Sequence, residues 1–349
     1  MKYPNPDFWR GRRVLLTGHT GFKGSWLALM LSELGAEVIG AALPPEPGPS
    51  LHAITAPASR LVHHVMDLRE PAPIAALVRE TRPFVVLHLA AQALVPRGFT
   101  DPVGTFAANL TCTINVLEAI RGAPGIAAAL MVTTDKVYRN PGDGRQFCED
   151  DPLGGDDPYS ASKAAAELAV ASWRASFAAD LPPLATARAG NVMGGGDFAP
   201  TRLVPDLVRA RTGTAKLVLR HPRATRPWQH VLDVLTGYLL QVEHLAAHPG
   251  APPALNFGPA EIDRSSVLDI IAGFEAAFEI ALPWQQAENS PFEAPLLTLD
   301  STLAKKTLGW APRLDRDGCI AATASWYAAW ARGEKMRARC VSDVKEALG

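Results

Sequence analysis

A tyrosine and a lysine, Tyr159 and Lys163, follow Pro158 with one helical turn between them. If this stretch is helical, the two side chains lie on the same face. The lysine ammonium then favours the phenolate and lowers the pKa of the tyrosine from its usual value of about 10. Such a tyrosine can take the proton of an alcohol while a hydride leaves the same carbon. The same spacing also occurs by chance on exposed helices, so its meaning depends on the rest of the chain.

A second group of reactive side chains is Thr134-Asp135-Lys136, which follows an apolar run predicted to be a strand over 127–133. In open parallel sheets ligands bind at the carboxyl ends of strands. Thr134 is placed to hydrogen-bond the same hydroxyl as Tyr159, with Asp135 as a general acid and Lys136 as a base. The alternative is an ordinary solvated turn, and the position after a strand favours the catalytic interpretation.

The elements before these groups predict a dinucleotide site. Residues 13–17 form a short apolar strand, three glycines follow (Gly18, Gly21, Gly24), and the next residues have the apolar spacing of a helix. Glycines let the backbone approach a pyrophosphate, and the helix N-terminus offers it free N–H groups. The sequence therefore predicts the first βαβ unit of a nucleotide-binding domain.

Later strands leave the choice between NAD and NADP open. The strand predicted at 37–42 ends in Ala42 without the acidic residue that often holds the ribose, and no arginine replaces it. Asp67, after a third strand at 61–66, could bond the adenine amino group or cap the helix at Pro71. The apolar run 84–91 predicts a central strand with small residues at its end and His88 packed inside.

Strands alternating with helices predict an α/β fold, a Rossmann-type doubly wound parallel sheet. We expect it to cover residues 1–188, with a smaller substrate-binding lobe in 189–349 that is partly interleaved with it. Arg202 and Arg226 are candidates for a diphosphate, because guanidinium forks match phosphate oxygens; either could instead be a surface arginine. His230 is predicted to be a capping or packing residue rather than a base, and the residues from Arg332 on to be loosely held.

Composition narrows the function. The net charge of −1 over 349 residues argues against a nucleic-acid binder. The sequence shows no secretory signal, and we expect no stretch long enough to cross a membrane. The cysteines have no paired metal spacing, so we expect no metal site and reduced thiols in a cytoplasmic protein. They are Cys112, Cys148, Cys319 and Cys340.

Several motifs together resemble one family. They are Thr17–Gly24, Ala90-Ala91-Gln92, Thr134–Lys136, Tyr159 with Lys163, and the blocks 188–197, 226–231 and 256–258. The chain resembles extended short-chain dehydrogenase/reductases, and within them the CDP-glucose 4,6-dehydratases. Related dTDP-glucose and GDP-mannose enzymes usually have a glutamate at the position of Lys136. The segment Ala93–Phe99 departs from the usual Pro-Leu-Val-Arg-x-Ser-Tyr.

The resemblance implies tightly held NAD and conversion of CDP-D-glucose to CDP-4-keto-6-deoxy-D-glucose and water. The steps would be oxidation at C4, elimination across C5 and C6, and hydride return to C6. It also implies a homodimer or homotetramer joined through a helix bundle that includes the Tyr159 helix. Another nucleotide-sugar 4,6-dehydratase, a 4-epimerase, or a dinucleotide-binding module without activity are the alternatives.

The motifs and the resemblance together define the expected site. The catalytic residues are Thr134, Asp135, Lys136, Tyr159 and Lys163. The residues expected to hold the cofactor are Gly18, Thr20, Gly21, Phe22, Lys23, Gly24, Asp67, Leu68, Leu89, Ala90, Ala91, Asn109, Tyr159 and Lys163. Those expected to hold the substrate are Gln92, Asn191, Arg202 and Arg226.

Overall fold

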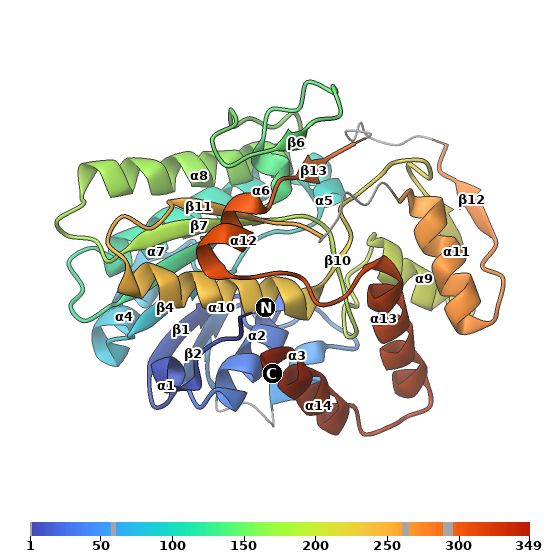
Figure 1. The fold of residues 1–349 in the computed structure, drawn as a ribbon, viewed down its shortest axis with the longest axis horizontal. Coiled ribbons are helices and arrows are strands. Elements are labelled where there is room, and N and C mark those ends of the chain that lie inside the picture. The colour runs from blue at the N-terminus through green and yellow to red at the C-terminus, as the bar shows by residue number, and fades with distance from the viewer. Residues whose placement is uncertain (1, 57–60, 260–264, 289–295) are drawn as a thin grey trace.

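The computed structural model describes residues 2–56, 61–259, 265–288 and 296–349. Its centre is a parallel sheet of seven strands in the order β11-β7-β5-β4-β1-β2-β3 (Figure 1). The strands are β1 (Arg13–Thr17), β2 (Glu37–Ala42), β3 (Leu61–Val65), β4 (Val85–His88), β5 (Ala128–Val132), β7 (Leu184–Ala189) and β11 (Ala254–Phe257). The order reverses between β1 and β4, which is the point where α/β sheets bind ligands. The doubly wound parallel sheet is confirmed.

Helices cover both faces of this sheet (Figure 1). On one face, α4 (Pro71–Thr81), α7 (Cys112–Ile120) and α8 (Pro158–Ser176) share one apolar cluster with the sheet. On the other face, α2 (Phe22–Glu33), α10 (Val231–Ala247) and α14 (Met336–Leu348) share a second one. Strands β1, β4 and β5 are apolar almost throughout because both of their faces are covered.

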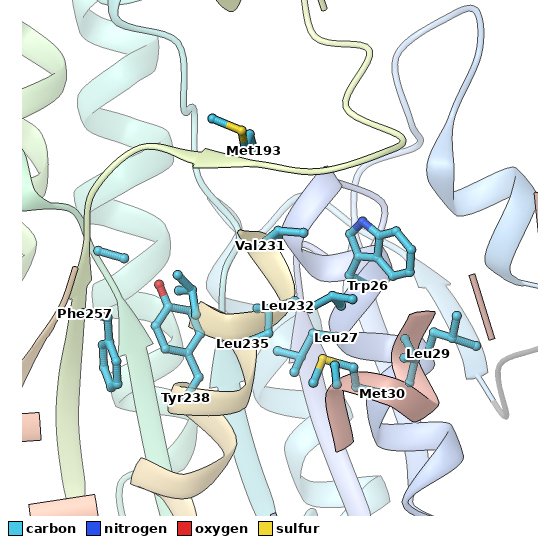
Figure 2. Close-up of a cluster of buried hydrophobic side chains, with 14 of the residues drawn as sticks. Trp26, Leu27, Leu29, Met30, Met193, Val231, Leu232, Leu235, Tyr238 and Phe257 are labelled. Carbon is cyan, nitrogen blue, oxygen red and sulfur yellow. The ribbon is translucent and has the colours of Figure 1, made fainter. Parts of the chain in front are cut away.

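The second half of the chain contributes to the first domain's core. Side chains of α10, such as Leu232 and Leu235, pack beside Trp26 and Met30 of α2 (Figure 2). Strand β11 pairs with β7 at the edge of the same sheet. A division at residue 188 therefore separates two segments that share one core.

The remaining part of the second half forms a lobe at one end of the sheet (Figure 1). It contains α9 (Leu203–Arg211), α11 (Val267–Phe278), α13 (Arg316–Ala331) and the paired strands β8 (Val192–Met193) with β10 (Gln229–His230) and β9 (Leu217–Leu219) with β12 (Trp284–Gln286). Short elements elsewhere are α1 (Pro6–Trp9), α3 (Leu51–Thr55), α5 (Val95–Thr100), α6 (Pro102–Phe106), the π-helix η2 (Ala107–Thr111), the 3-10 helix η3 (Asp135–Val137), α12 (Thr302–Leu308), and β6 (Gln146–Phe147) paired with β13 (Thr298–Leu299).

The prediction of a loose C-terminus is wrong. Helix α14 packs against α2, and Met336, Cys340, Val344 and Ala347 are buried. These residues recur every three or four positions, so they form one apolar face of the helix. Charged residues lie between them in the sequence, so composition alone does not reveal the apolar face.

The expectation that no stretch reaches membrane-spanning length is also wrong on length and composition. The continuous helical segment Pro102–Ile120 contains 19 residues with a mean hydropathy of 1.3. Such helices also occur in the cores of soluble proteins, and here Cys112, Val116, Leu117 and Ile120 pack into the cluster beneath the sheet.

Candidate active site

The glycine turn joins the end of β1 to the start of α2. Gly18 has φ +73°, and a Cβ there would lie 2.6 Å from the backbone nitrogen of Ala90. A Cβ on Gly24 would lie 2.1 Å from the Gly18 carbonyl oxygen. Gly21, in contrast, is the exposed N-cap of α2 and has only that same carbonyl oxygen nearby, at 3.4 Å. Two glycines thus keep the turn tight and the third leaves the helix N-terminus open, which fits the pyrophosphate of a dinucleotide.

Other predicted cofactor residues line the neighbouring strand ends. The Thr20 hydroxyl donates to the Leu43 carbonyl at 2.9 Å and holds the turn against the segment after β2. The backbone nitrogens of Leu89 and Ala90 both donate to the Thr17 hydroxyl, at 3.1 and 3.2 Å. Phe22, Lys23, Ala90 and Ala91 are half-buried, and Leu68 is buried.

Asp67 does not cap the following helix. Glu70 occupies the N-cap of α4 and makes no side-chain capping bond. The Asp67 carboxylate instead accepts both the backbone N–H and the side-chain Nε–H of Arg69, which lowers the pKa of the carboxyl group. The helix-cap alternative is therefore wrong, and the adenine contact stays a prediction.

The side chains of Asn109 and Gln92 form hydrogen bonds that support the site. Asn109 is fully buried in the π-helix; its Oδ1 accepts the Gln92 backbone N–H at 2.8 Å and its Nδ2 donates to Ser162 on α8 at 2.9 Å. The Gln92 amide itself bonds to Thr105 at 2.9 Å and to the Leu94 backbone at 2.6 Å. Both amides are thus used to join the strand end to the tyrosine helix, a role that the sequence analysis missed.

The tyrosine and lysine that the sequence analysis singled out lie on α8. Asp157 caps this helix through a 3.0 Å bond from the Ser160 N–H, and Pro158 occupies its first turn. Tyr159 and Lys163 are only 8% and 5% exposed. The Lys163 ammonium donates to the Val132 carbonyl at the end of β5 at 3.1 Å, and burial lowers its pKa to about 8.

The expected depression of the tyrosine pKa is wrong for the protein alone. Burial raises the pKa of Tyr159 to about 12, while a hydrogen bond with Thr134 and the charge of Arg202 act in the opposite direction. Desolvation of a phenolate outweighs these contacts because the side chain is almost fully enclosed. Further positive charge beside the phenol is needed to make it a base at neutral pH.

Thr134 and Asp135 meet Tyr159 at the carboxyl end of β5. The Thr134 hydroxyl donates to Asp135 Oδ1 at 2.8 Å. Asp135 is 2% exposed and its Oδ2 has no hydrogen-bond partner. Burial raises the pKa of this carboxyl group, although Lys136 and the Thr134 hydroxyl act against the shift. A carboxyl group that keeps its proton to higher pH is suited to the role of general acid.

Cations gather around this carboxyl group. Lys23 from the glycine turn approaches the Tyr238 phenol at 3.4 Å, and burial followed by the charge of Arg202 lowers its pKa to about 8. Arg202 is held by Asp197 at 3.0 Å. Arg226 is 5% exposed and close enough to Asp135 to lower its pKa. Three distant segments thus supply positive charge to the region around Asp135 and Tyr159, which suits an anionic substrate.

Two histidines have structural roles, as predicted. His88 is buried between Thr17 and Thr113, at 2.7 and 3.2 Å, and burial lowers its pKa to about 3. His230 caps α10 by accepting the Leu232 N–H. Asn191 is half-buried and its carbonyl accepts the Gln229 N–H at 3.2 Å, so its side chain's role stays a prediction.

The unusual segment 93–99 lies directly against the tyrosine helix. Most of it forms α5, and a Cβ on Gly98 would lie 3.2 Å from the backbone nitrogen of Tyr159. A glycine therefore lets the two helices approach closely. Arg97 lies on the exposed side, 3.6 Å from Glu46. The departure from the family pattern thus changes the wall of the cleft next to Tyr159.

A buried ion pair supports α8 one turn beyond the lysine. Glu167 and Arg188 form a 2.8 Å ion pair with side chains only 3% and 6% exposed. Glu167 also accepts hydrogen bonds from the hydroxyls of Thr133 and Thr186, at 2.5 and 2.9 Å. It raises the pKa of Lys163 against the larger effect of burial. In the sequence, Glu167 follows Lys163 at the same four-residue interval that separates Lys163 from Tyr159. This repeated spacing was the signal that could have identified it.

Glu167→Gln is expected to destabilise the protein by about 3–5 kcal/mol, because it leaves the buried Arg188 charge without its partner. Chemical denaturation measures this change. The matched control is Glu118→Gln, which breaks the Arg121–Glu118 pair on the surface, where side chains are 38% and 40% exposed. Its expected cost is below about 1 kcal/mol. Equal effects of the two variants would contradict a supporting role for the buried pair.

Comparison with known proteins identifies the family. Residues 14–258 match the model of the NAD dependent epimerase/dehydratase family. The chain belongs to this family. The protein of Salmonella typhimurium named CDP-glucose 4,6-dehydratase is 39% identical over 339 residues, which are 95% of this chain and 94% of the relative. The dTDP-glucose 4,6-dehydratase of Xanthomonas campestris pv. campestris is 25% identical over 90% of this chain and 92% of the relative.

Solved structures of family members share the fold. UDP-glucose 4-epimerase of Thermus thermophilus in complex with NAD superposes with a TM-score of 0.78 at 25% identity, covering 90% of this chain and 99% of the epimerase. The dTDP-glucose 4,6-dehydratase DesIV of Streptomyces venezuelae, also with NAD bound, has a TM-score of 0.78 at 23% identity over 92% of this chain and 98% of DesIV. The fold alone therefore does not distinguish dehydratases from epimerases.

Proposed function

We propose that this chain is an NAD-dependent nucleotide-sugar 4,6-dehydratase that converts CDP-D-glucose to CDP-4-keto-6-deoxy-D-glucose and water. The observation that carries the proposal is the buried carboxyl group of Asp135, next to Lys136 and linked through Thr134 to Tyr159. The 39% identity to the Salmonella CDP-glucose 4,6-dehydratase supports the same assignment.

The first task of the site is to remove the C4 hydroxyl proton. Tyr159 is the proposed base, and Thr134 hydrogen-bonds the phenol and orients the sugar hydroxyl beside it. NAD, when bound in the glycine turn, supplies the acceptor for the C4 hydride and the donor that returns it to C6. Tyr159 would lose its proton more readily if the bound cofactor supplied a positive charge near the phenol, because that charge would oppose the effect of burial.

The second task is elimination of water. The new C4 ketone acidifies the C5 proton, and Lys136 is the proposed base that removes it. Asp135 is then proposed to protonate the departing C6 hydroxyl; burial raises the pKa of this carboxyl group, which favours its role as the acid. Lys163 holds the tyrosine helix to the end of β5 through the Val132 carbonyl and provides a positive charge behind the phenol.

The substrate's diphosphate is proposed to bind the guanidinium groups of Arg202 and Arg226, with Asn191 beside them. Arg202 is oriented by its bond to Asp197, and both arginines lie close enough to the catalytic residues to influence their pKa values. Their charge offsets the two negative charges of a nucleoside diphosphate.

A 4-epimerase is the second candidate, because the structural relatives include UDP-glucose 4-epimerases. Such a reaction returns the hydride to C4 and needs no acid for a leaving hydroxyl. It gives no role to the desolvated carboxyl group of Asp135, and burying a carboxyl group without function is costly. We therefore favour the dehydratase.

A panel of sugar nucleotides tests this choice. Incubation with CDP-glucose is expected to give a 4-keto-6-deoxy sugar, detected by its absorbance in alkali, at a rate well above those with dTDP-glucose, UDP-glucose and GDP-mannose. A higher rate with another sugar nucleotide would overturn the assignment of CDP-glucose as substrate, while the assignment as a 4,6-dehydratase would stand. Interconversion of glucose and galactose configurations without a ketosugar would overturn the dehydratase assignment.

We also propose a cytoplasmic homodimer or homotetramer joined through the outer faces of α6 and α8. Three apolar side chains stand out from these helices: Val103, Phe106 and Leu168, which are 80%, 37% and 60% exposed. Leu168→Glu is expected to give monomers in size-exclusion chromatography with light scattering. Leu303→Glu, at an exposed apolar position on α12, should leave the oligomer intact. If the Leu168→Glu and Leu303→Glu variants had the same mass, the contact between subunits would lie on another surface.

A further inference from the structure

Three histidines from separate segments meet beside the glycine turn. His19 follows Gly18, His52 lies on α3 and His63 lies on β3. One ring nitrogen from each lies within 4.8 Å of the other two. The ring centroids are 4.7 Å apart for His19 and His63, and 5.4 Å apart for each of the other two pairs.

The inner histidine is held in place by its surroundings. His19 is fully buried, and its ring lies on the backbone of β2 at Gly40, where a Cβ would be only 2.6 Å from the ring atoms Cγ and Nδ1. Only glycine leaves space for the ring at this strand position. Nε2 of His19 faces Nδ1 of His63, and Nδ1 of His19 has no hydrogen bond of normal geometry.

The other two histidines open the cluster to solvent. His52 is half-buried and His63 is exposed, so an ion has a path to the inner ring. A hydrophobic packing role does not explain why one half-buried and one exposed imidazole converge on a buried one. Imidazole nitrogens are preferred ligands of zinc and related divalent ions, and three of them plus a solvent molecule complete a tetrahedral site.

We propose that His19, His52 and His63 bind one divalent transition-metal ion of the zinc class. In a tetrahedral site with metal–nitrogen distances of about 2.0–2.1 Å the nitrogens lie about 3.3 Å apart. In the structure one nitrogen of each ring lies within 4.8 Å of the other two, so binding an ion would require the side chains to adjust to this spacing. No step of the proposed reaction uses the ion; it would link the glycine turn to α3 and β3 and so stabilise the folded chain.

Cobalt(II) provides a direct probe, because its visible absorption reports tetrahedral nitrogen coordination. The holoenzyme is stripped with a chelator and titrated with Co²⁺, then with Zn²⁺. We expect one equivalent to bind with a tetrahedral spectrum that Zn²⁺ abolishes. His52→Ala and His63→Ala should each weaken binding by more than the roughly 10–100-fold that loss of an outer-shell partner costs.

Two controls identify the ligands. His64 follows His63 on the same strand, so its side chain points to the opposite face, and His64→Ala should bind as the unmodified protein does. His244 and His248 stack on α10 with ring centroids 4.1 Å apart and form a competing pair. Loss of the spectrum in His248→Ala, with His52→Ala and His63→Ala unaffected, would overturn the proposal.

A measurement on the unmodified protein keeps the test independent of folding in the variants. Crystals soaked in Zn²⁺ should show an anomalous peak between the three rings. An absence of Co²⁺ absorption together with no peak at this position would also overturn the proposal.

Discussion

Tyr159→Phe is expected to lower the rate of ketosugar formation by at least the 10²–10⁴-fold typical of a lost proton-transfer group. The substitution removes one oxygen atom and leaves the ring that packs against α5. Since the hydride cannot leave C4 while the hydroxyl keeps its proton, the transient absorbance of reduced nicotinamide should disappear as well. Rapid mixing with CDP-glucose measures both signals.

The matched control is the second phenol of the cleft. Tyr238 on α10 is fully buried against Phe257, and its hydroxyl contacts Lys23 (Figure 2). Burial raises its pKa far above the usual value, so it is a poor base. Tyr238→Phe should cost much less activity than Tyr159→Phe. A larger loss of activity in Tyr238→Phe than in Tyr159→Phe would assign the proton transfer to Tyr238 and contradict the proposed mechanism.

Asp135→Asn is expected to separate the two halves of the reaction. The amide has the size of the carboxyl group but cannot protonate a leaving hydroxyl, so dehydration should slow by about 10²–10⁴-fold. Oxidation at C4 depends on Tyr159 and should continue, with reduced nicotinamide accumulating during the stall. Unchanged turnover in this variant would remove Asp135 from the mechanism.

Protein stability provides an internal control for the same variant. Oδ2 of Asp135 is buried without a hydrogen bond, so the native carboxyl group carries a desolvation cost. An uncharged side chain of equal size should leave the melting temperature equal or higher, as is common where function requires an unfavourable group. A drop in activity together with a large loss of stability would point to a structural role.

Lys136→Met should stop the reaction one step earlier, at the removal of the C5 proton. In deuterated water, Asp135→Asn is expected to exchange the C5 proton of the oxidised sugar, because its base is intact. Lys136→Met should not exchange this proton. Mass spectrometry of recovered sugar distinguishes the two variants, and exchange in Lys136→Met would assign the base to another residue.

The sequence analysis predicted a lowered pKa for Tyr159, and the surroundings of the side chain explain why this prediction is wrong. Spacing on a helix correctly placed Lys163 one turn from Tyr159, but the ammonium bonds to the Val132 carbonyl and burial dominates the phenol. Helix α5, which packs against α8, and Arg202, whose charge acts on the phenol, come from segments distant in sequence. Desolvation is therefore a tertiary property.

The sequence by itself determined the parallel sheet, the glycine turn, the tyrosine helix, and the group after β5. Each depends on local features: a run of apolar residues, glycines at fixed spacing, or a tyrosine and a lysine one helical turn apart. Helix α14 was missed because its apolar face becomes evident only against α2.

The tertiary structure alone decided which side chains meet. It brought Lys23 and Arg226 to the Asp135 carboxyl group and Arg202 to Tyr159. It also joined Asn109 to Gln92 by a hydrogen bond and placed Glu167 against Arg188. It also gathered three histidines that no motif connects. These contacts join residues tens to hundreds of positions apart, and their distances follow from how the layers pack, which local sequence patterns do not specify.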